Sequence, residues 1–215
     1  MASFCASVSL GTPGSFCARL MVLDAPRAAL DAGMAFVSED RRSVGLLLDE
    51  SLDWNIAFTA MQIKGEYLKP YLGGLIKLRD EKAMRELTEE YVRLLEIKCT
   101  GPKQKAKELS GGNQQKVCLA KAFALKPKLL FVSEPTRGID VGAKELVLNN
   151  LRHYNRDFGT TIVMVSSELE ELRSICDRIA IVDEGRIAGI LPPDTPREKF
   201  GLLLAGERTA AEVRP

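Results

Sequence analysis

The chain has 215 residues, with 30 Lys and Arg against 29 Asp and Glu and a formal net charge of +1. This length suits one large domain, or one domain with an inserted subdomain, and the balanced charge excludes binding to nucleic acid through an overall positive field. Five scattered cysteines without CxxC or CxxH spacing are typical of buried thiols in a reduced, cytoplasmic protein, and no apolar stretch approaches the roughly 20 residues that span a bilayer.

The first 50 residues divide into two segments. Residues 1–23 contain small, Ser- and Gly-containing stretches without periodicity, so we predict an atypical or poorly ordered N-terminal segment. Residues 24–50 begin with a short helix over 24–31, where Pro26 suits the first turn and Gly33 ends it. A short strand over 34–37 follows, and Glu39 lies in the loop after it, at the sheet edge where ligand-binding loops of α/β proteins lie.

Residues 51–125 are predicted to form a mostly helical subdomain. Residues 51–97 have few strand signals, and helical spacing places Leu87, Tyr91, Leu94 and Leu95 on one face. A basic loop over 101–107 precedes a helix from about residue 113 to 125, which Pro127 ends.

Residues 126–206 alternate between strands and helices. We predict strands near 129–133, 160–167, 178–183 and 186–191, and helices near 143–157 and 168–176. This alternation indicates a mainly parallel sheet covered on both faces, and the two-residue turn Glu184-Gly185 indicates a terminal hairpin. The pattern predicts no further helix or strand over residues 192–206, and residues 207–215 are expected to form a mobile tail.

Two segments carry the chemistry. Residues 109–116 read Leu-Ser-Gly-Gly-Asn-Gln-Gln-Lys, a turn that opens a helix, where free amide groups and the positive end of the helix dipole favour a phosphate. Residues 129–140 form a buried strand that ends in the carboxylate of Glu134. Without a ligand, the turn would be a simple helix cap and Glu134 a solvated loop carboxylate. The order and separation of the two segments resemble the ATP-binding cassette (ABC) ATPases, and the wordings SGGNQQK and EPTRGIDVGAK resemble the second cassette of fused sugar- or nucleoside-type importers.

The resemblance implies an α/β fold of the P-loop NTPase kind, with a helical signature subdomain and a truncated N-terminal part. It implies ATP and Mg²⁺ as cofactors, shared with another ABC cassette that closes face to face on this one. Glu134 corresponds to the general base, and the following residues correspond to the signature that reaches the nucleotide of the opposite cassette: Ser110, Gly111, Gly112, Asn113 and Gln114. The other implied partner is a membrane permease bound through residues 51–97, which places the chain at the cytoplasmic face of the cell membrane.

Three positions depart from the family pattern. Ser133 replaces the aspartate that holds Mg²⁺ through water, Glu39 replaces the Q-loop glutamine, and Ser167 replaces the switch histidine. A serine donates a hydrogen bond but cannot carry a proton as histidine does. Asp140 matches the D-loop that passes to the partner cassette. The wordings around Glu39 and Ser167 recur in second cassettes of fused sugar importers, so these changes are either lineage features or lost function.

The phosphate-binding motif GxxxxGK[ST] does not occur in these 215 residues, because the first lysine is Lys64, beyond the Glu39 loop. The resemblance therefore covers about residues 24–206, and we expect no ATPase activity from this chain alone. The alternative function is a regulatory cassette that dimerises with a competent ATPase and never hydrolyses ATP. A soluble ABC ATPase of DNA repair or translation is disfavoured, since long heptad arms and a basic linker are missing. His153 is expected at the surface, and Arg41-Arg42 are expected to pair with the adjacent Glu39-Asp40.

Overall fold

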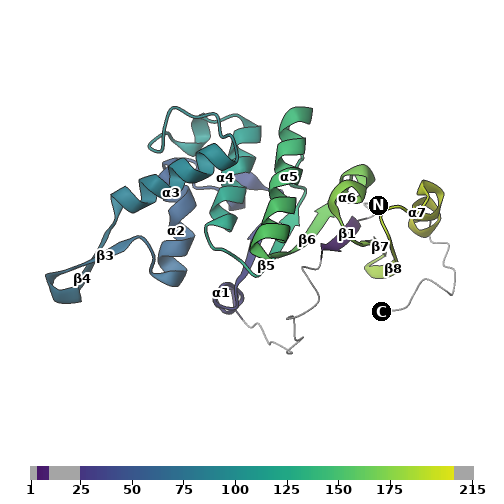
Figure 1. Cartoon of the computed structure of the whole chain (residues 1–215), viewed down its shortest axis with the longest axis horizontal. Coiled ribbons are helices and arrows are strands. Elements are labelled where there is room, and N and C mark those ends of the chain that lie inside the picture. The colour runs from purple at the N-terminus through teal and green to yellow at the C-terminus, as the bar shows by residue number, and fades with distance from the viewer. Residues whose placement is uncertain (1–3, 10–24, 206–215) are drawn as a thin grey trace.

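The computed structural model of this chain describes residues 4–9 and 25–205. Six strands form one sheet in the order β2-β5-β6-β1-β7-β8 (Figure 1). The neighbours β2 (Met34–Val37), β5 (Leu129–Ser133) and β6 (Thr161–Ser166) are parallel. By contrast, β1 (Phe4–Ser9) runs antiparallel between β6 and β7 (Ile179–Asp183), and β8 (Arg186–Leu191) pairs antiparallel with β7. The predicted α/β fold, its parallel strands and the β7–β8 hairpin are confirmed.

The parallel strands present different environments on their two faces. Ala35 and Val37 of β2 lie opposite Leu130 and Val132 of β5, and all four side chains are buried. The alternating positions Phe36 and Phe131 also face each other, but they are partly exposed and line an apolar cavity of about 570 Å³ with α1 (Pro26–Asp31) and α4 (Gly111–Phe123). Among the described residues, one face of the sheet edge is thus packed more completely than the other.

The helical region packs against the α/β region through aromatic side chains. In it, α2 (Leu52–Lys64) contacts α3 (Glu81–Leu94) and α4, with the 3₁₀ turn η3 (Ala106–Glu108) before α4. The predicted apolar face of α3 is confirmed, because Tyr91 and Leu95 are buried and Leu87 and Leu94 pack against the core. The hydroxyl of Tyr154, on α5 (Val141–Phe158), donates to the Tyr91 hydroxyl over 3.0 Å, and its ring stacks on Phe123 at 3.5 Å. These contacts fix the helical region to α5.

Three elements were absent from the sequence prediction. Residues 4–9 form β1, although no regular element was expected in the first segment. A hairpin of β3 (Leu68–Tyr71) and β4 (Ile76–Arg79), joined through the 3₁₀ turn η2 (Leu72–Gly74), interrupts the region expected to be helical. A helix, α7 (Arg197–Leu204), follows β8, where Phe200 and Leu203 are buried. The predicted tail over 207–215 and the remainder of the first segment lie outside the described residues, and the proposed domain boundaries stay predictions.

The remaining elements match the alternation of the sequence. A single π-helical turn, η1 (Arg41–Gly45), follows β2, and α6 (Leu169–Ile175) follows β6. Both α5 and α6 contact β6 (Figure 1). None of the helices described is long and apolar enough to cross a membrane.

Candidate nucleotide-binding site

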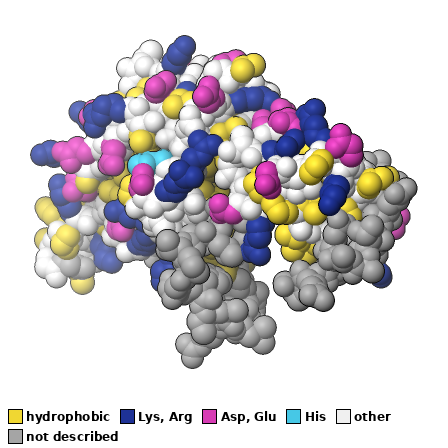
Figure 2. Space-filling view, turned by 45° about the vertical axis from the view of Figure 1, so that its right-hand side comes forward, with side chains coloured by type: hydrophobic (Ala, Val, Ile, Leu, Met, Phe, Trp, Pro, Cys, Tyr) yellow, Lys and Arg dark blue, Asp and Glu magenta, His cyan; other side chains and the backbone are white. Residues whose placement is uncertain are grey.

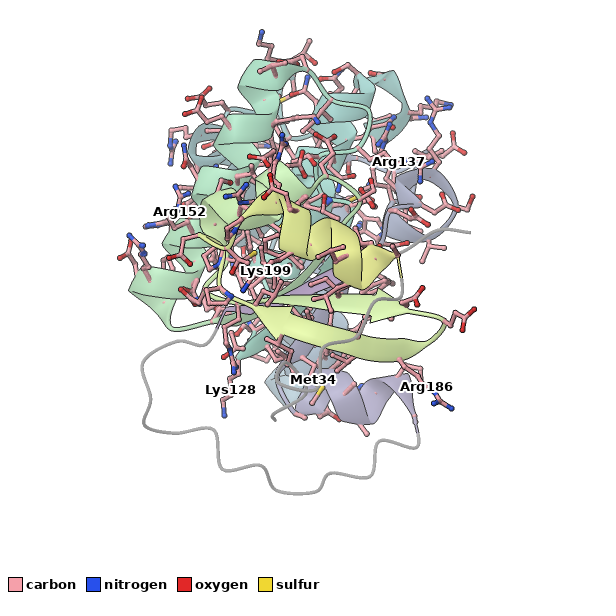
Figure 3. All side chains as sticks on the ribbon, turned by 90° about the vertical axis from the view of Figure 1, so that its right-hand side faces the viewer. Met34, Lys128, Arg137, Arg152, Arg186 and Lys199 are labelled. Carbon is pink, nitrogen blue, oxygen red and sulfur yellow. The ribbon has the colours of Figure 1, made fainter. Side chains whose placement is uncertain are left out.

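Two neighbouring strands bring a carboxylate and a serine together. Ser133 ends β5 and is followed by Glu134, while Ser167 follows the end of β6. The Glu134 carboxylate accepts a hydrogen bond from the Ser167 amide at 2.7 Å and one from the Ser167 hydroxyl at 3.3 Å. Ser133, Glu134 and Ser167 thus lie at the ends of the adjoining strands β5 and β6. In Figure 3, Arg137, which follows β5 in the chain, and Lys128, which precedes it, lie on opposite sides of the view.

Glu134 is held in an unfavourable backbone conformation. Its φ is +46°, in the left-handed region that non-glycine residues rarely occupy, at a cost on the order of 1–3 kcal/mol. Its amide donates to the Val165 carbonyl at 2.8 Å, and its carbonyl accepts from the Arg137 amide at 3.2 Å. The side chain is 8% exposed. The carboxylate is therefore fixed toward Ser167, with lone pairs left over that can accept from a water molecule.

A second carboxylate lies behind this turn and was missed by sequence reasoning. Glu171 of α6 is buried and accepts from the Thr136 hydroxyl at 2.6 and 2.7 Å and from the Ser166 hydroxyl at 3.0 Å. Lys144 of α5 reaches it at 3.2 Å and also pairs with Glu168. These bonds fasten the turn after β5 to β6 and α6. No sequence signal could have found them, because Thr136 and Glu171 lie 35 residues apart.

The signature turn leaves the N-terminus of α4 open. Ser110 is the N-cap of α4, but its side chain makes no capping bond; its hydroxyl accepts from the Asn113 side chain at 3.0 Å instead. The amides of Gly111, Gly112 and Asn113 have no hydrogen-bond partner within the described part of the chain. At α5, by contrast, the Asp140 carboxylate accepts from the Ala143 amide at 3.0 Å, and this bond lowers the pKa of Asp140. An uncapped 13-residue helix is suited to an anion.

Both signature glycines lie close to side chains of neighbouring elements. A Cβ at Gly111 would lie 2.8 Å from the Nη2 atom of Arg41, and one at Gly112 would lie 3.3 Å from the Cγ2 atom of Ile139. The turn is thus pressed against η1 and against the loop that ends at Asp140. This tight approach supplies a structural reason for the two glycines, independent of any ligand.

Asn113 and Gln114 have supporting contacts. The Asn113 side-chain oxygen accepts from the Lys98 amide at 2.9 Å, which ties the signature to the loop after α3. Gln114 does not fit the role assigned to it: it is 2% exposed and donates to the Ala106 carbonyl at 3.1 Å. Because this side chain lies inside the helical region, it supports η3 and does not face a ligand.

The loop after β2 is connected to the loop after β5. Glu39 pairs with Arg137 at 2.9 Å, and Arg41 donates to the Arg137 carbonyl at 3.2 Å. The expected pairing of Arg41 with its acidic sequence neighbours is therefore wrong. With Asp40, Arg42 and Gly138, these residues line a polar cavity of about 430 Å³. His153, as expected, lies at the surface of α5, where it pairs with Asp157.

The residues around the N-terminus of α4 and the turn after β5 fit a phosphate-bearing ligand better than a free metal ion. The open amides of α4 and the guanidinium of Arg41 attract anions. No cluster of three or more His, Cys, Asp or Glu residues able to hold a metal occurs in the part of the chain described. Mg²⁺ prefers oxygen ligands and often shares phosphate oxygens, and here Ser133 offers it a neutral hydroxyl beside the carboxylate of Glu134.

Comparison with known proteins gives the same assignment. Residues 25–137 match the family described as ABC transporter. The ribose import ATP-binding protein RbsA of Caldanaerobacter subterraneus subsp. tengcongensis is 38% identical over 183 residues, which are 85% of this chain and 35% of that protein. RbsA 2 of Rhizobium meliloti is 42% identical over 177 residues, 82% of this chain and 33% of that protein. The chain thus spans about a third of the length of these relatives.

A solved structure supports the fold. A dimeric ATP-binding cassette in a post-hydrolysis state, bound to ADP and Pi, superposes with a TM-score of 0.65 at 21% identity, covering 81% of this chain and 69% of that chain. Since the family match covers more than half of the residues, this chain belongs to the ABC transporter family.

Proposed function

We propose that this chain is part of the ATP-binding subunit of a sugar importer and contributes Ser110–Asn113 to a nucleotide held by another ABC cassette. The observation that carries this proposal is the uncapped N-terminus of α4, whose amides are free while Arg41 and Ile139 support the turn from behind. The names of the relatives, which are ribose import ATP-binding proteins, support a sugar as the solute class.

Each residue at the site has a distinct role in this proposal. The Ser110 hydroxyl and the amides of Gly111 and Gly112 bind oxygens of the γ-phosphate through charge-assisted hydrogen bonds. Glu134 is the general base toward a nucleotide on its own side of the interface, which is not the nucleotide that Ser110–Asn113 contact, while Ser167 holds the Glu134 carboxylate in place. ATP supplies the phosphoryl group, and Mg²⁺ neutralises its charge. Ser133 places a neutral hydroxyl where water-mediated contact with the ion is expected.

The D-loop position and the helical region complete the assembly. Asp140 is exposed beside the signature turn, at the end of the loop that supports Gly112, and we propose that it lies at the boundary with the second cassette. Glu39, bonded to Arg137, connects the loop after β2 with that boundary. Residues 51–97 then contact a membrane permease, which places the chain at the cytoplasmic face of the membrane.

A second candidate is a regulatory cassette that closes on a competent partner without hydrolysing ATP. Ser133 and Ser167 favour it, because neither supplies the negative charge that Mg²⁺ prefers nor a proton carrier. The two functions share the signature contact and differ only in the chemistry of Glu134.

Complex formation tests the shared contact. This chain is mixed with a ribose-importer cassette that carries its own GxxxxGK[ST] motif, and the size of the complex is followed by light scattering with and without ATP. We expect an ATP-dependent complex that Ser110→Arg abolishes, because an arginine fills the turn where the γ-phosphate approaches. His153→Ala, on the far surface of α5, is the control. An equal complex with Ser110→Arg would show that the signature turn is only a helix cap.

Hydrolysis separates the two candidates. In the same mixture, Glu134→Gln is expected to lower the turnover contributed by this chain about 100-fold if Glu134 is the general base. An ATP-dependent complex whose turnover is the same with Glu134→Gln identifies the regulatory cassette. This chain by itself is expected to show no ATPase above background, and a turnover of the isolated chain that Glu134→Gln abolishes refutes the shared site.

A further inference from the structure

We propose that the β3–β4 hairpin, residues 68–79, inserts its tip into the surface of an anionic phospholipid membrane. At the tip, Leu75 is 86% exposed, Leu72 is 64% exposed and Tyr71 is 56% exposed. A patch of exposed apolar side chains on one element often marks an interaction site. In Figure 1 the hairpin projects from the helical region at the left of the molecule, away from the large sheet.

The hairpin has little support from the rest of the chain. Its strands form a two-stranded sheet of their own, with Tyr71 opposite Ile76 and Leu68 opposite Arg79. Nearly all of its described side chains are exposed. A two-stranded hairpin is marginally stable in water, so a surface that covers its apolar side chains would stabilise it.

The pairing register makes the hairpin amphipathic. Because side chains alternate along each strand, Tyr71, Ile76 and Leu78 lie on one face together with Lys69. The opposite face carries Lys77 and Arg79 beside Leu68 and Pro70. An apolar face and tip combined with basic side chains is the pattern of elements that lie in the membrane interface, where long basic side chains reach the headgroups.

The charge of the hairpin identifies the kind of membrane. Residues 68–79 include Lys69, Lys77 and Arg79 and no acidic residue. Lys69 pairs with Asp80 at 2.9 Å at the base, whereas Lys77 has no ion-pair partner in the described part of the chain. Anionic lipids attract such basic groups within a Debye length of the surface. Figure 2 shows apolar, basic and acidic side chains together at the left-hand edge of the molecule.

A spectroscopic reporter on α2 lies beside the hairpin. Trp54, the only tryptophan of the chain, lies under the guanidinium of Arg79, which is 5.0 Å from the ring centroid. Insertion of the tip would move Arg79 toward lipid phosphates and change the environment of this ring. Binding can therefore be followed by fluorescence without a label.

The experiment uses the full chain without nucleotide, so its result does not depend on the proposed ATPase function. Vesicles of phosphatidylcholine alone and of equal parts phosphatidylcholine and phosphatidylglycerol are sedimented with the protein, and Trp54 emission is recorded. We expect sedimentation and an emission shift with the anionic vesicles, both weakened by added salt. Absence of binding to the anionic vesicles would overturn the proposal.

Matched variants locate the contact. Leu75→Asp is expected to weaken binding about tenfold or more, and Lys77→Glu to weaken binding to the anionic vesicles in particular. Ile187→Asp changes an exposed apolar residue in the other hairpin, β7–β8, and is expected to bind as the parent does. Circular dichroism checks that each variant is folded. Equal binding by Leu75→Asp and the parent contradicts the proposal, and so does a vesicle-free oligomer that Leu75→Asp dissolves, which would identify a second copy as the occupant.

Discussion

The turn after β5, residues 133–140, and the β3–β4 hairpin, residues 68–79, use the same unfavourable backbone conformation in different surroundings. Glu134 has a φ of +46° and Leu72 a φ of +49°. Around Glu134, bonds to Ser167 and between Thr136 and Glu171 hold the turn to the rest of the sheet. Around Leu72, the side chains are exposed, and in the sheet the two strands pair only with each other. Tertiary bonds keep the first turn in a defined geometry, while the second remains available to another surface.

Among the substitutions that test this difference between the two turns, the largest loss of folding stability is expected at Glu171. Glu171→Ala leaves the buried Thr136 and Ser166 hydroxyls without their acceptor and removes one of the two carboxylates that Lys144 pairs with, so we expect a loss of about 2–4 kcal/mol in the free energy of unfolding. The midpoint of urea unfolding measures it. Glu170→Ala is the control. The Glu170 carboxylate is exposed and forms ion pairs only at the surface, so its removal is expected to cost about 0–1 kcal/mol. Equal losses for the two variants would contradict the role assigned to Glu171.

A smaller effect is expected where the signature turn meets the loop after β5. Gly112→Ala introduces a Cβ 3.3 Å from Ile139, and we expect a loss of about 1 kcal/mol. Ile139→Ala removes the opposing methyl group, so the double variant should cost less than the sum of the two single changes. Urea unfolding of all four proteins gives the coupling energy. Strict additivity would show that this close approach does not constrain the glycine.

The pH dependence of stability tests the contribution of Asp140, which ends the turn after β5. The Ala143 amide holds the pKa of Asp140 below its ordinary value of 3.8, so this carboxylate contributes stability above that pH and loses it as the pH falls through the lowered pKa. Asp140→Asn is therefore expected to be less stable than the parent near neutral pH, with the difference shrinking under acid conditions. Unfolding midpoints measured from pH 7 downward test this, and parallel curves for the two proteins would contradict it.

The smallest effect is expected at the hairpin tip. Leu75→Ala removes an apolar side chain that is exposed in the folded chain, so the free energy of unfolding should change by about 0.5 kcal/mol or less. Thermal and urea unfolding in the absence of vesicles measure this. A loss above about 1 kcal/mol would mean that the tip is packed, and the contrast with the turn after β5 would then disappear.

The sequence by itself determined the alternation of strands and helices, because apolar periodicity marks single elements. It did not determine the order of the strands, since β6 and β7 follow each other along the chain and yet β1 lies between them in the sheet. The prediction that Glu134 and Ser167 meet came from the resemblance to the ABC ATPases. That resemblance rested on residues 109–116 and 129–140, and the comparisons with known proteins confirm it.

Only the tertiary structure decided which side chains support the site. Gln114 follows the signature in sequence, yet its side chain is buried in the helical region and donates to the Ala106 carbonyl. Arg137 bonds Glu39, and Glu171 bonds Thr136, across separations of 98 and 35 residues. The strands β1, β3 and β4 form by pairing with other strands, and no pattern within their own residues predicted which strands these are. Local periodicity records which side of an element is buried, but the identity of the partner is set by how the elements pack, because hydrogen bonds and close contacts form between surfaces that meet only in the folded chain.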